Sequence, residues 1–365
     1  MKLLWLTNIP SPYRVDFFNE LGKLCELTVL FEKRSASDRD DSWKSFNVKN
    51  FKAIFLKGIQ YGPTESFCPE VIRYLNPKKY DKIVVTNYSN LTGILAVAVM
   101  KMRRIPYIIE SDGAFAGSGK GLKEKVKKWL IEKSALCFST SDVHDNYYKK
   151  YGASRDKLVR YPFTSLHDAD VLTAPVSAEK KSELREKLGI AESRMIVSVG
   201  QFIPRKGFDV LIEAMAHVDS NVGCYIIGGT PPEEYIQQVE ALGLKNIHFV
   251  GFKCKDDLAE YYMAADLFVL PTREDIWGLV VNEAMAKGLP VITTDRCIAG
   301  LALITSQALG KIVPIEDDGA LADAIEEKLS ALCPEMNRAV LNTISNYTFE
   351  KMAEVHMEIL EEKQR

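Results

Sequence analysis

The chain lacks the compositional marks of several protein classes. Its seven cysteines are scattered, odd in number and never spaced as Cys-x-x-Cys, so we expect neither a disulfide framework nor a zinc site, and a reducing cytoplasm fits best. Lysine plus arginine number 47 against 49 aspartate plus glutamate, and the net charge of −2 argues against nucleic-acid binding through bulk charge. The first apolar run, in "MKLLWLTNIPSPYR", is too short for a signal-peptide core or a membrane span. It predicts a buried strand instead.

Two motifs with defined chemistry are also missing. No Gly-x-Gly-x-x-Gly follows a predicted strand, and "GGT" at 228–230 is too short to replace it, which disfavours a dinucleotide dehydrogenase. The five histidines are not clustered at metal-ligand spacing, so satisfied or solvated histidines are expected rather than ligands.

What the chain does contain is a regular alternation of short apolar runs and longer amphipathic segments. Runs such as "KLLWLTN", "DKIVVTN", "MIVSVGQ" and "LFVLPT" are nearly all apolar, which is typical of parallel strands covered on both faces by helices. The alternation weakens in a polar stretch and then starts again. The predicted fold class is therefore α/β, with two tandem Rossmann-like, doubly wound parallel sheets: an N-terminal domain over 1–168, a linker over 169–192, a C-terminal domain over 193–345 and a separate amphipathic helix over 346–365.

Ligands of such sheets bind at the carboxyl ends of the strands, so the loops after the apolar runs are the ones to examine. In "VGQFIPRKGFDVLIEA", Arg205 and Lys206 precede Gly207 at a strand-to-helix turn. Two cations beside the N–H groups of a helix start suit a diphosphate. Taken alone, a solvated Arg-Lys pair explains the motif as well.

The stretch "PTREDIWGLVVNEAMAKGLPVI" at 271–292 contains three carboxylates beside a predicted helix start at Gly278. Glu283 lies in that helix, within reach of a nucleoside hydroxyl, while the helix N-terminus could receive phosphate. Asp275 precedes the helix and suits the hydroxyls of a sugar. Glu274 and Asp275 could instead simply favour the helix start electrostatically.

These motifs together, with "IGGTPPEEY", resemble the donor-binding domain of retaining glycosyltransferases of the GT-B architecture, in the family numbered four. The resemblance implies that an acidic pair grips the donor sugar and the ribose, and that basic residues bind the diphosphate. Here the pair reads Asp-x7-Glu, with either Asp275 or the adjacent Glu274 on the sugar and Glu283 on the ribose. Lys206 matches the family lysine, whereas the position after Gly200, often Arg in relatives, is Gln201. Arg205 is expected to supply that positive charge instead. The implied donor-binding residues are Gly200, Gln201, Arg205, Lys206, Gly229, Phe252, Glu274, Asp275, Trp277, Gly278, Leu279 and Glu283.

The N-terminal domain is similar to the family in fewer motifs. "NIPSPYRVDFF" resembles a subset of bacterial surface-polysaccharide enzymes, and Tyr13 and Arg14 are predicted on the acceptor side; a purely structural Pro-rich turn is the alternative. The loop "SDGAFAGSGKG" lies where relatives often carry an active-site histidine. Asp112 is predicted there as a catalytic residue, with Glu110 second, to stabilise positive charge on the sugar or to orient the acceptor hydroxyl.

The segment "KGLKEKVKKWLIEK" at 120–133 predicts a basic amphipathic helix. Such a helix can lie on the inner face of an anionic membrane, as in a peripheral membrane protein, or be an ordinary surface helix whose apolar stripe packs on the sheet.

The resemblance implies a retaining hexosyltransferase that moves a sugar from a UDP- or GDP-sugar to a glycan or lipid-linked glycan in polysaccharide biosynthesis. Asp112, Asp275, Lys206 and Arg205 are the predicted catalytic residues. No cofactor or metal is expected, because "DAD" at 168–170 lacks the strand context of an Asp-x-Asp metal motif. The predicted C-terminal helix would return to the N-terminal domain. The alternatives are a nucleotide-sugar epimerase of the same fold and a non-catalytic nucleotide-sugar-binding protein.

Overall fold

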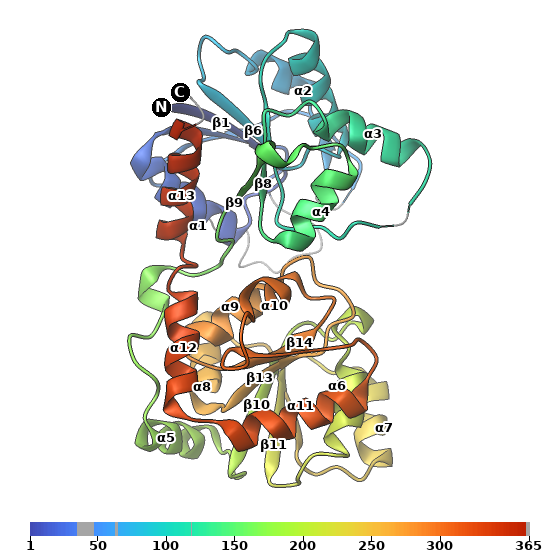
Figure 1. Cartoon of the computed structure of the whole chain (residues 1–365), viewed down its shortest axis with the longest axis vertical. Helices are drawn as coiled ribbons and strands as arrows, with labels where there is room; N and C mark the ends of the chain where they lie inside the picture. Colours follow the sequence, from blue (N-terminus) through green and yellow to red (C-terminus); the bar gives the residue numbers. More distant parts are fainter. Residues whose placement is uncertain (35–46, 63–64, 118, 363–365) are drawn as a thin grey trace. The chain divides into compact units, whose positions relative to one another are not determined.

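The computed structural model describes residues 1–34, 47–62, 65–117 and 119–362, and it consists of two compact units (Figure 1). The first unit combines residues 1–164 with the C-terminal segment that starts at Thr348, and the second runs from Ser165 to Tyr347. Each unit has its own parallel sheet, as the alternation of apolar runs predicts. No helix of the described ranges is long and apolar enough to cross a membrane.

The sheet of the first unit has seven parallel strands in the order β3-β2-β1-β6-β7-β8-β9. The central strand β1 buries five of its six residues, which explains why it reads as a continuous apolar run. A separate antiparallel pair joins β4 to β5. The strands of this unit are β1 (Lys2–Thr7), β2 (Glu26–Phe31), β3 (Lys52–Phe55), β4 (Ile59–Gln60), β5 (Ser66–Phe67), β6 (Lys82–Val85), β7 (Ile108–Glu110), β8 (Leu136–Ser139) and β9 (Leu158–Arg160).

The C-terminal helix α13 (Phe349–Glu362) belongs to this first unit and packs against α1 (Pro12–Leu24), beside which it lies in Figure 1. Its buried residues recur at helical spacing on one face, and His356 is among them. The rings of Trp5 and Phe17 lie 5.9 and 4.9 Å from the His356 ring. The other helices of the unit are α2 (Leu91–Met102), α3 (Leu122–Ile131) and α4 (Asp142–Lys150), with the short 3-10 helices η2 (Pro69–Arg73) and η3 (Arg155–Lys157).

The sheet of the second unit has six parallel strands in the order β12-β11-β10-β13-β14-β15. The chain progresses outward from β10 to β12 and then returns to β13 on the other side of β10. The strand order therefore reverses between β10 and β13, and this is the position at which doubly wound sheets bind ligands. The strands are β10 (Arg194–Val199), β11 (Val222–Ile227), β12 (Ile247–Val250), β13 (Leu267–Leu270), β14 (Val291–Thr294) and β15 (Gly310–Val313).

Helices α6, α7 and α11 of the second unit enclose one apolar core with the sheet. Phe208, Leu211 and Ile212 of α6 are fully buried there. Helix α5 packs against α8, and α12 against α9. The helices of this unit are α5 (Ala178–Leu188), α6 (Phe208–Met215), α7 (Glu233–Ala241), α8 (Lys255–Ala264), α9 (Leu279–Ala286), α10 (Ile298–Leu303), α11 (Asp318–Ala331) and α12 (Pro334–Ile344), with the 3-10 helices η4 (Asp168–Asp170) and η5 (Pro204–Lys206).

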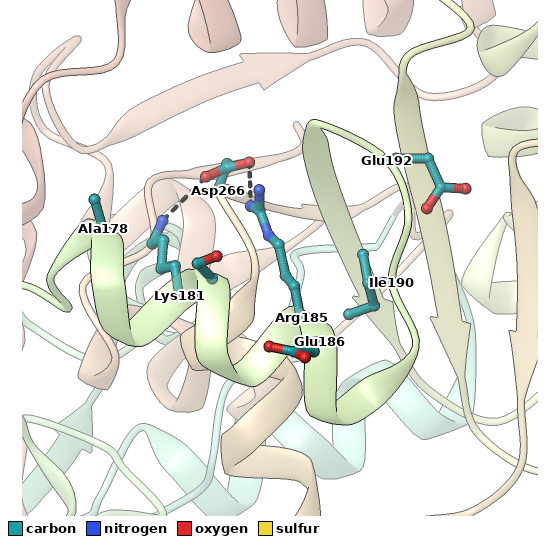
Figure 2. A pocket seen from close by; sticks show the side chains of 8 residues that line it. Ala178, Lys181, Arg185, Glu186, Ile190, Glu192 and Asp266 are labelled. Carbon is teal, nitrogen blue, oxygen red and sulfur yellow. Dashed lines mark hydrogen bonds and ion pairs between the residues drawn. The ribbon is translucent and has the colours of Figure 1, made fainter.

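Residues 169–192, predicted as a linker, form part of the second unit instead. Lys181 and Arg185 of α5 approach the two carboxylate oxygens of Asp266 to 3.1 and 2.6 Å, and the Asp266 side chain is nearly buried (Figure 2). The polar composition of this stretch suggested a linker, but part of its charge is paired with a carboxylate at the amino end of β13. The sequence therefore suggested a linker where the structure has a packed helix of the second unit.

Candidate functional site

Two loops meet where the strand order of the second unit reverses. One follows β10 and carries η5, and the other follows β13. Arg205 Nη1 donates to the Glu274 carbonyl over 2.6 Å, and the Arg273 N–H donates to the Arg205 carbonyl over 2.8 Å. The Thr272 hydroxyl also donates to the Arg205 carbonyl over 3.0 Å. These cross-links hold the two loops in one arrangement before any ligand binds, and such preorganisation favours electrostatic catalysis.

Glycines make the close approach of these loops feasible. Gly207 has a φ of 68°, and a Cβ at this position would lie 2.1 Å from the Pro271 carbonyl oxygen. Gly278 has a φ of 104°, and a Cβ there would lie 3.0 Å from the Cys297 sulfur. Both positions require a left-handed backbone and leave little space, so residues with side chains are strained there.

Three of the predicted charged residues come together in these loops. Lys206 Nζ lies 2.6 Å from Oδ2 of Asp275, and Arg205 Nη1 lies 3.2 Å from Oδ1. The backbone of Asp275 is also fixed, because its N–H donates to the Arg296 carbonyl over 2.8 Å. The largely buried Asp275 carboxylate thus pairs with two cations, so the three side chains together carry one net positive charge. A net positive charge favours the binding of an anion.

Glu274 and Asp275 differ in their surroundings. The Glu274 side chain is half exposed and accepts a hydrogen bond from Arg296 Nη2 over 2.6 Å. Of these two carboxylates, Asp275 is the one that pairs with both Arg205 and Lys206. The geometry therefore favours Asp275 as the acid that belongs to the cationic cluster.

Helix α9 begins at Leu279, directly after Gly278, and has no side-chain cap. The first N–H groups of a helix have no partner within it, so they can bind an anion. Glu283 lies one turn further along and is partly buried. It accepts hydrogen bonds from the Tyr262 hydroxyl over 3.3 Å and from the Ser165 hydroxyl over 3.4 Å. Burial raises the pKa of Glu283 to about 6, although these two hydroxyls oppose the shift.

Tyr262 and Ser165 were not predicted as site residues. Tyr262 reads as an ordinary apolar position of α8, and Ser165 stands more than a hundred positions before Glu283 in the chain. Only their shared contact with Glu283 connects them with the site. No local sequence signal identifies them.

The remaining predicted donor residues differ in how far they are exposed to solvent. Phe252, after β12, is 73% exposed, and Gln201 is exposed in the loop after β10. Gly200, Gly229 and Leu279 are partly buried at strand or helix ends of the same edge. Trp277 differs from its prediction, because its side chain is 2% exposed and its indole N–H donates to Asn282 Oδ1 over 2.8 Å. Its large apolar ring is part of the core, and the side chain is not available to a ligand.

The predicted acceptor-side residues form a cluster in the first unit. Arg14, from the first turn of α1, forms ion pairs with Glu110 and with Asp112. The Tyr13 hydroxyl donates to Oδ2 of Asp112 over 2.7 Å. Asp112 keeps 22% of its side chain exposed. It is therefore the carboxylate of this cluster that solvent or a ligand can reach.

Arg14 and Glu110 were predicted to face an acceptor, and the structure buries both. Burial alone would raise the pKa of Glu110, but Arg14 and His356 together hold the pKa below its ordinary value. A buried carboxylate needs such partners to stay ionised. These two side chains support Asp112 from the interior and do not line an accessible surface.

Helix α3 is only partly packed. Leu130 and Ile131 are buried, whereas Leu122 is 78% exposed and Trp129 is 39% exposed. Lys101 Nζ lies 3.9 Å from the centre of the Trp129 ring. The predicted apolar stripe therefore packs on the unit through Leu130 and leaves Leu122 and much of Trp129 open to solvent.

A hollow of about 600 Å³ on the second unit is lined by none of the predicted donor-binding residues (Figure 2). It is lined by residues of α5, by Ile190 and Glu192 after that helix, and by Asp266, which directly precedes β13. It thus lies at the amino ends of the strands, opposite to the edge that carries Arg205 and Lys206. Lys181 and Arg185 already pair with Asp266 there.

Part of the chain matches a known protein family. Residues 180–340 match the family described as Glycosyl transferases group 1. The chain is 30% identical over 205 residues to the D-inositol 3-phosphate glycosyltransferase of Xylanimonas cellulosilytica, covering 52% of this chain and 47% of that protein. It is 24% identical over 366 residues to the putative teichuronic acid biosynthesis glycosyltransferase TuaC of Bacillus subtilis, covering 89% and 88% of the two chains. The chain thus spans about half the length of the first relative and most of the second.

Among solved structures, the chain is similar to Anabaena Alr3699/HepE in complex with UDP and glucose. The TM-score is 0.74 and the identity 16%, over 99% of this chain and 100% of that one. At this identity the likeness establishes the fold. The predicted GT-B architecture is therefore confirmed, and so is the resemblance to glycosyltransferases of bacterial polysaccharide biosynthesis.

Proposed function

We propose that this chain, a glycosyltransferase of the GT-B fold with a group 1 domain at residues 180–340, transfers a hexose from a nucleotide-diphosphate sugar to a hydroxyl acceptor. The observation that carries the proposal is the convergence of Arg205, Lys206 and Asp275 with the start of α9, at the reversal of strand order. This arrangement places two cations close to the N-terminal end of a helix. A diphosphate needs both.

The proposed donor site divides the ligand among three groups. Arg205, Lys206 and the α9 N-terminus bind the diphosphate, Asp275 accepts from hydroxyls of the sugar, and Glu283 accepts from the ribose. Negative charge accumulates on the diphosphate as its bond to the sugar breaks. The cations and the helix end stabilise that charge more in the transition state than in the ground state, and this difference accelerates the reaction.

Retention of configuration is part of the proposal, and the surroundings of Asp275 bear on how it would be achieved. Both of its carboxylate oxygens are paired with cations, which makes the group a weak nucleophile. A covalent glycosyl-enzyme through Asp275 is therefore disfavoured, and we propose a front-side displacement with retention of configuration. Arg205 and Lys206 supply positive charge that a divalent cation would otherwise provide, so the proposed transfer needs no metal and no cofactor. Turnover that persists in excess EDTA tests this point.

A UDP-sugar is the first donor to test, because a solved structure with the same fold is described as a complex with UDP and glucose. A GDP-sugar is the second. Phe252 is a candidate to stack on the base, since its ring is largely exposed on the loop after β12. We propose a glycan or a lipid-linked glycan as acceptor, in polysaccharide biosynthesis. The similarity to the putative teichuronic acid enzyme TuaC supports this choice.

We further propose that the chain works in the cytoplasm, at the inner face of an anionic membrane. The exposed side chains of Leu122 and Trp129, with lysines beside them on α3, support peripheral contact with such a surface.

The decisive experiment begins with a thermal-shift panel of UDP, GDP, UDP-sugars and GDP-sugars, in which the strongest stabiliser identifies the base. Product analysis with that donor follows, with and without candidate acceptors. A glycoside formed only with acceptor, with the donor's anomeric configuration, supports the proposal. Epimer formed from donor alone would point to an epimerase, and binding without turnover across all acceptors would point to a non-catalytic protein.

A further inference from the structure

A continuous chain of charged groups crosses the interior of the first unit. Its members come from α13, β7, α1 and the loop after β7. His356 Nε2 lies 3.0 Å from Oε2 of Glu110, and the other oxygen of Glu110 bonds Nη1 of Arg14. Nη2 of Arg14 bonds Oδ1 of Asp112. The chain therefore ends at the only one of its four members whose side chain is more than slightly exposed.

The partners of His356 determine its protonation. Nδ1 lies 2.7 Å from the Met352 carbonyl oxygen, and Nε2 faces a carboxylate oxygen of Glu110. A carbonyl and an ionised carboxylate only accept hydrogen bonds. Both ring nitrogens therefore face acceptors, and a ring that donates from each of them, an imidazolium, satisfies both contacts. The rings of Trp5, Phe17, Phe138 and Tyr161 also pack around His356, and among these four rings only the Tyr161 phenol titrates.

With His356 charged, the four groups carry two positive and two negative charges. A buried cluster of zero net charge is far less costly than one with an unpaired ion. Loss of the His356 charge would leave one excess negative charge beside Arg14, and Glu110 and Asp112 would then compete for a single guanidinium. The orientation of Asp112 depends on that competition, because Arg14 holds one of its oxygens and Tyr13 holds the other.

We propose that His356 is a positioning residue, and that its charge acts through Glu110 and Arg14 to fix the Asp112 carboxylate in its working orientation. The role assigned to Asp112 rests on the proposed function. A carboxylate whose two oxygens are both held is suited to orient an acceptor hydroxyl or to stabilise positive charge on the sugar, and it is a poor proton shuttle. Helix α13 thereby contributes to the reaction as well as to the fold.

The first test reads the His356 charge directly and does not depend on turnover. Two-bond 1H–15N spectra of the intact chain resolve ring nitrogens, and with five histidines the spectrum is simple. His356→Gln assigns the signal. We expect both His356 nitrogens to be protonated near neutral pH. A signal from an unprotonated ring nitrogen of His356 overturns the proposal.

The second test measures kcat and KM for release of UDP from UDP-glucose. His356→Gln keeps a donor toward Glu110 but removes the charge, and we expect kcat about tenfold lower with KM for UDP-glucose unchanged. Glu110→Gln leaves one excess positive charge and should also lower kcat. The double variant Glu110→Gln/His356→Gln is again neutral, and its kcat should return to within about threefold of the wild type. His217→Gln is the matched control, since His217 is an exposed histidine of the second unit.

The outcomes separate the inference from the proposed function. A His356→Gln protein with the kcat of the wild type overturns the positioning role. So does a double variant whose fold-loss in kcat equals the product of the fold-losses of the two single variants. If His356→Gln does not fold while the double variant does, charge balance is supported. Wild-type protein that binds no nucleotide sugar contradicts the proposed function alone, and the NMR test still decides the charge state of His356.

Discussion

Lys206 Nζ lies 2.6 Å from Oδ2 of Asp275, although 69 residues separate the two in the chain. The lysine follows β10 and the aspartate follows β13, which are neighbouring strands at the reversal of strand order. The carboxylate holds the ammonium group between the two loops, where it can interact with a diphosphate. The predictions about donor binding start from this pair.

Lys206→Ala should lower kcat by about a hundredfold or more, because it removes charge from the place where negative charge develops. The fold should persist, since the side chain lies at the edge of the sheet. Lys206→Arg retains the charge and should recover part of the loss. Steady-state kinetics with the donor identified by thermal shift, together with thermal unfolding, measures both effects. Near-normal kcat in a folded Lys206→Ala protein would refute the assignment.

Asp275→Asn and Glu274→Gln distinguish the two adjacent acids. We expect Asp275→Asn to reduce kcat/KM by about tenfold or more, because it removes the carboxylate proposed to accept from the sugar and leaves two cations unbalanced. Glu274→Gln should change kcat/KM by less than about threefold, since its carboxylate pairs with Arg296 at the surface. The opposite ranking would move the sugar contact to Glu274.

The affinity for UDP-glucose should rise with pH. The pKa of Glu283 is raised to about 6 in the ligand-free protein, and only the ionised carboxylate accepts from both ribose hydroxyls. Affinity should therefore increase by up to about tenfold per pH unit below 6 and level off above it. Titration calorimetry measures this dependence, and UDP-glucose avoids the terminal phosphate ionisation of UDP. Glu283→Gln should bind weakly and lose the dependence; an unchanged pH profile in this variant contradicts the ribose contact.

The same pKa shift has a consequence for stability without ligand. Because the folded pKa of Glu283 lies above its ordinary value of 4.5, the folded state binds more protons than the unfolded state between these two values. The stabilising contribution is complete below pH 4.5 and is lost as pH rises through about 6. Denaturant unfolding of wild type and Glu283→Gln across this range should show the difference.

Gly207→Ala should destabilise the second unit by about 2 kcal/mol or more, because the new Cβ requires both a left-handed backbone and space taken by the Pro271 carbonyl. Gly189→Ala is the matched control. Gly189 has a similar φ of 70°, but nothing lies within 4 Å of its added Cβ. The difference in unfolding free energy between the two variants isolates the close approach of the loops. Equal losses would mean that backbone strain alone is responsible.

The chain should pellet with vesicles that contain anionic lipid at low salt. Replacing the exposed residues Lys123, Lys125 and Lys128 with glutamate reverses their charge and should abolish pelleting. The unfolding temperature should change by no more than a few degrees, because these side chains are exposed on α3. Neutral vesicles are the control for apolar contact alone. Wild-type protein that stays in the supernatant with anionic vesicles at low salt would contradict the membrane proposal.

Much of the architecture could be predicted because it depends on local sequence patterns. Parallel strands buried on both faces read as continuous apolar runs, and the runs ending before Asn8, Gly200 and Pro271 coincide with β1, β10 and β13. Less apolar elements such as β9, with no buried residue, were not identified, because they have no such run. The charged stretch of α5 was interpreted as a linker because its pairing with Asp266 is not visible in sequence.

The chain's sequence by itself determined the two doubly wound sheets and the donor-site residues Arg205, Lys206, Asp275 and Glu283 as candidates. Arg205, Lys206 and Asp275 follow an apolar run by a few positions, and Glu283 lies in the helix that comes next, so strand and motif are read together. Only the tertiary structure decided that Trp277 is core, that Arg14 and Glu110 are buried, and that His356 contacts Glu110. Arg14 and Glu110 stand 96 residues apart, and Glu110 and His356 stand 246 apart. Burial and charge pairing over such separations arise only when the strands and helices pack, because water screens the same charges in the unfolded chain.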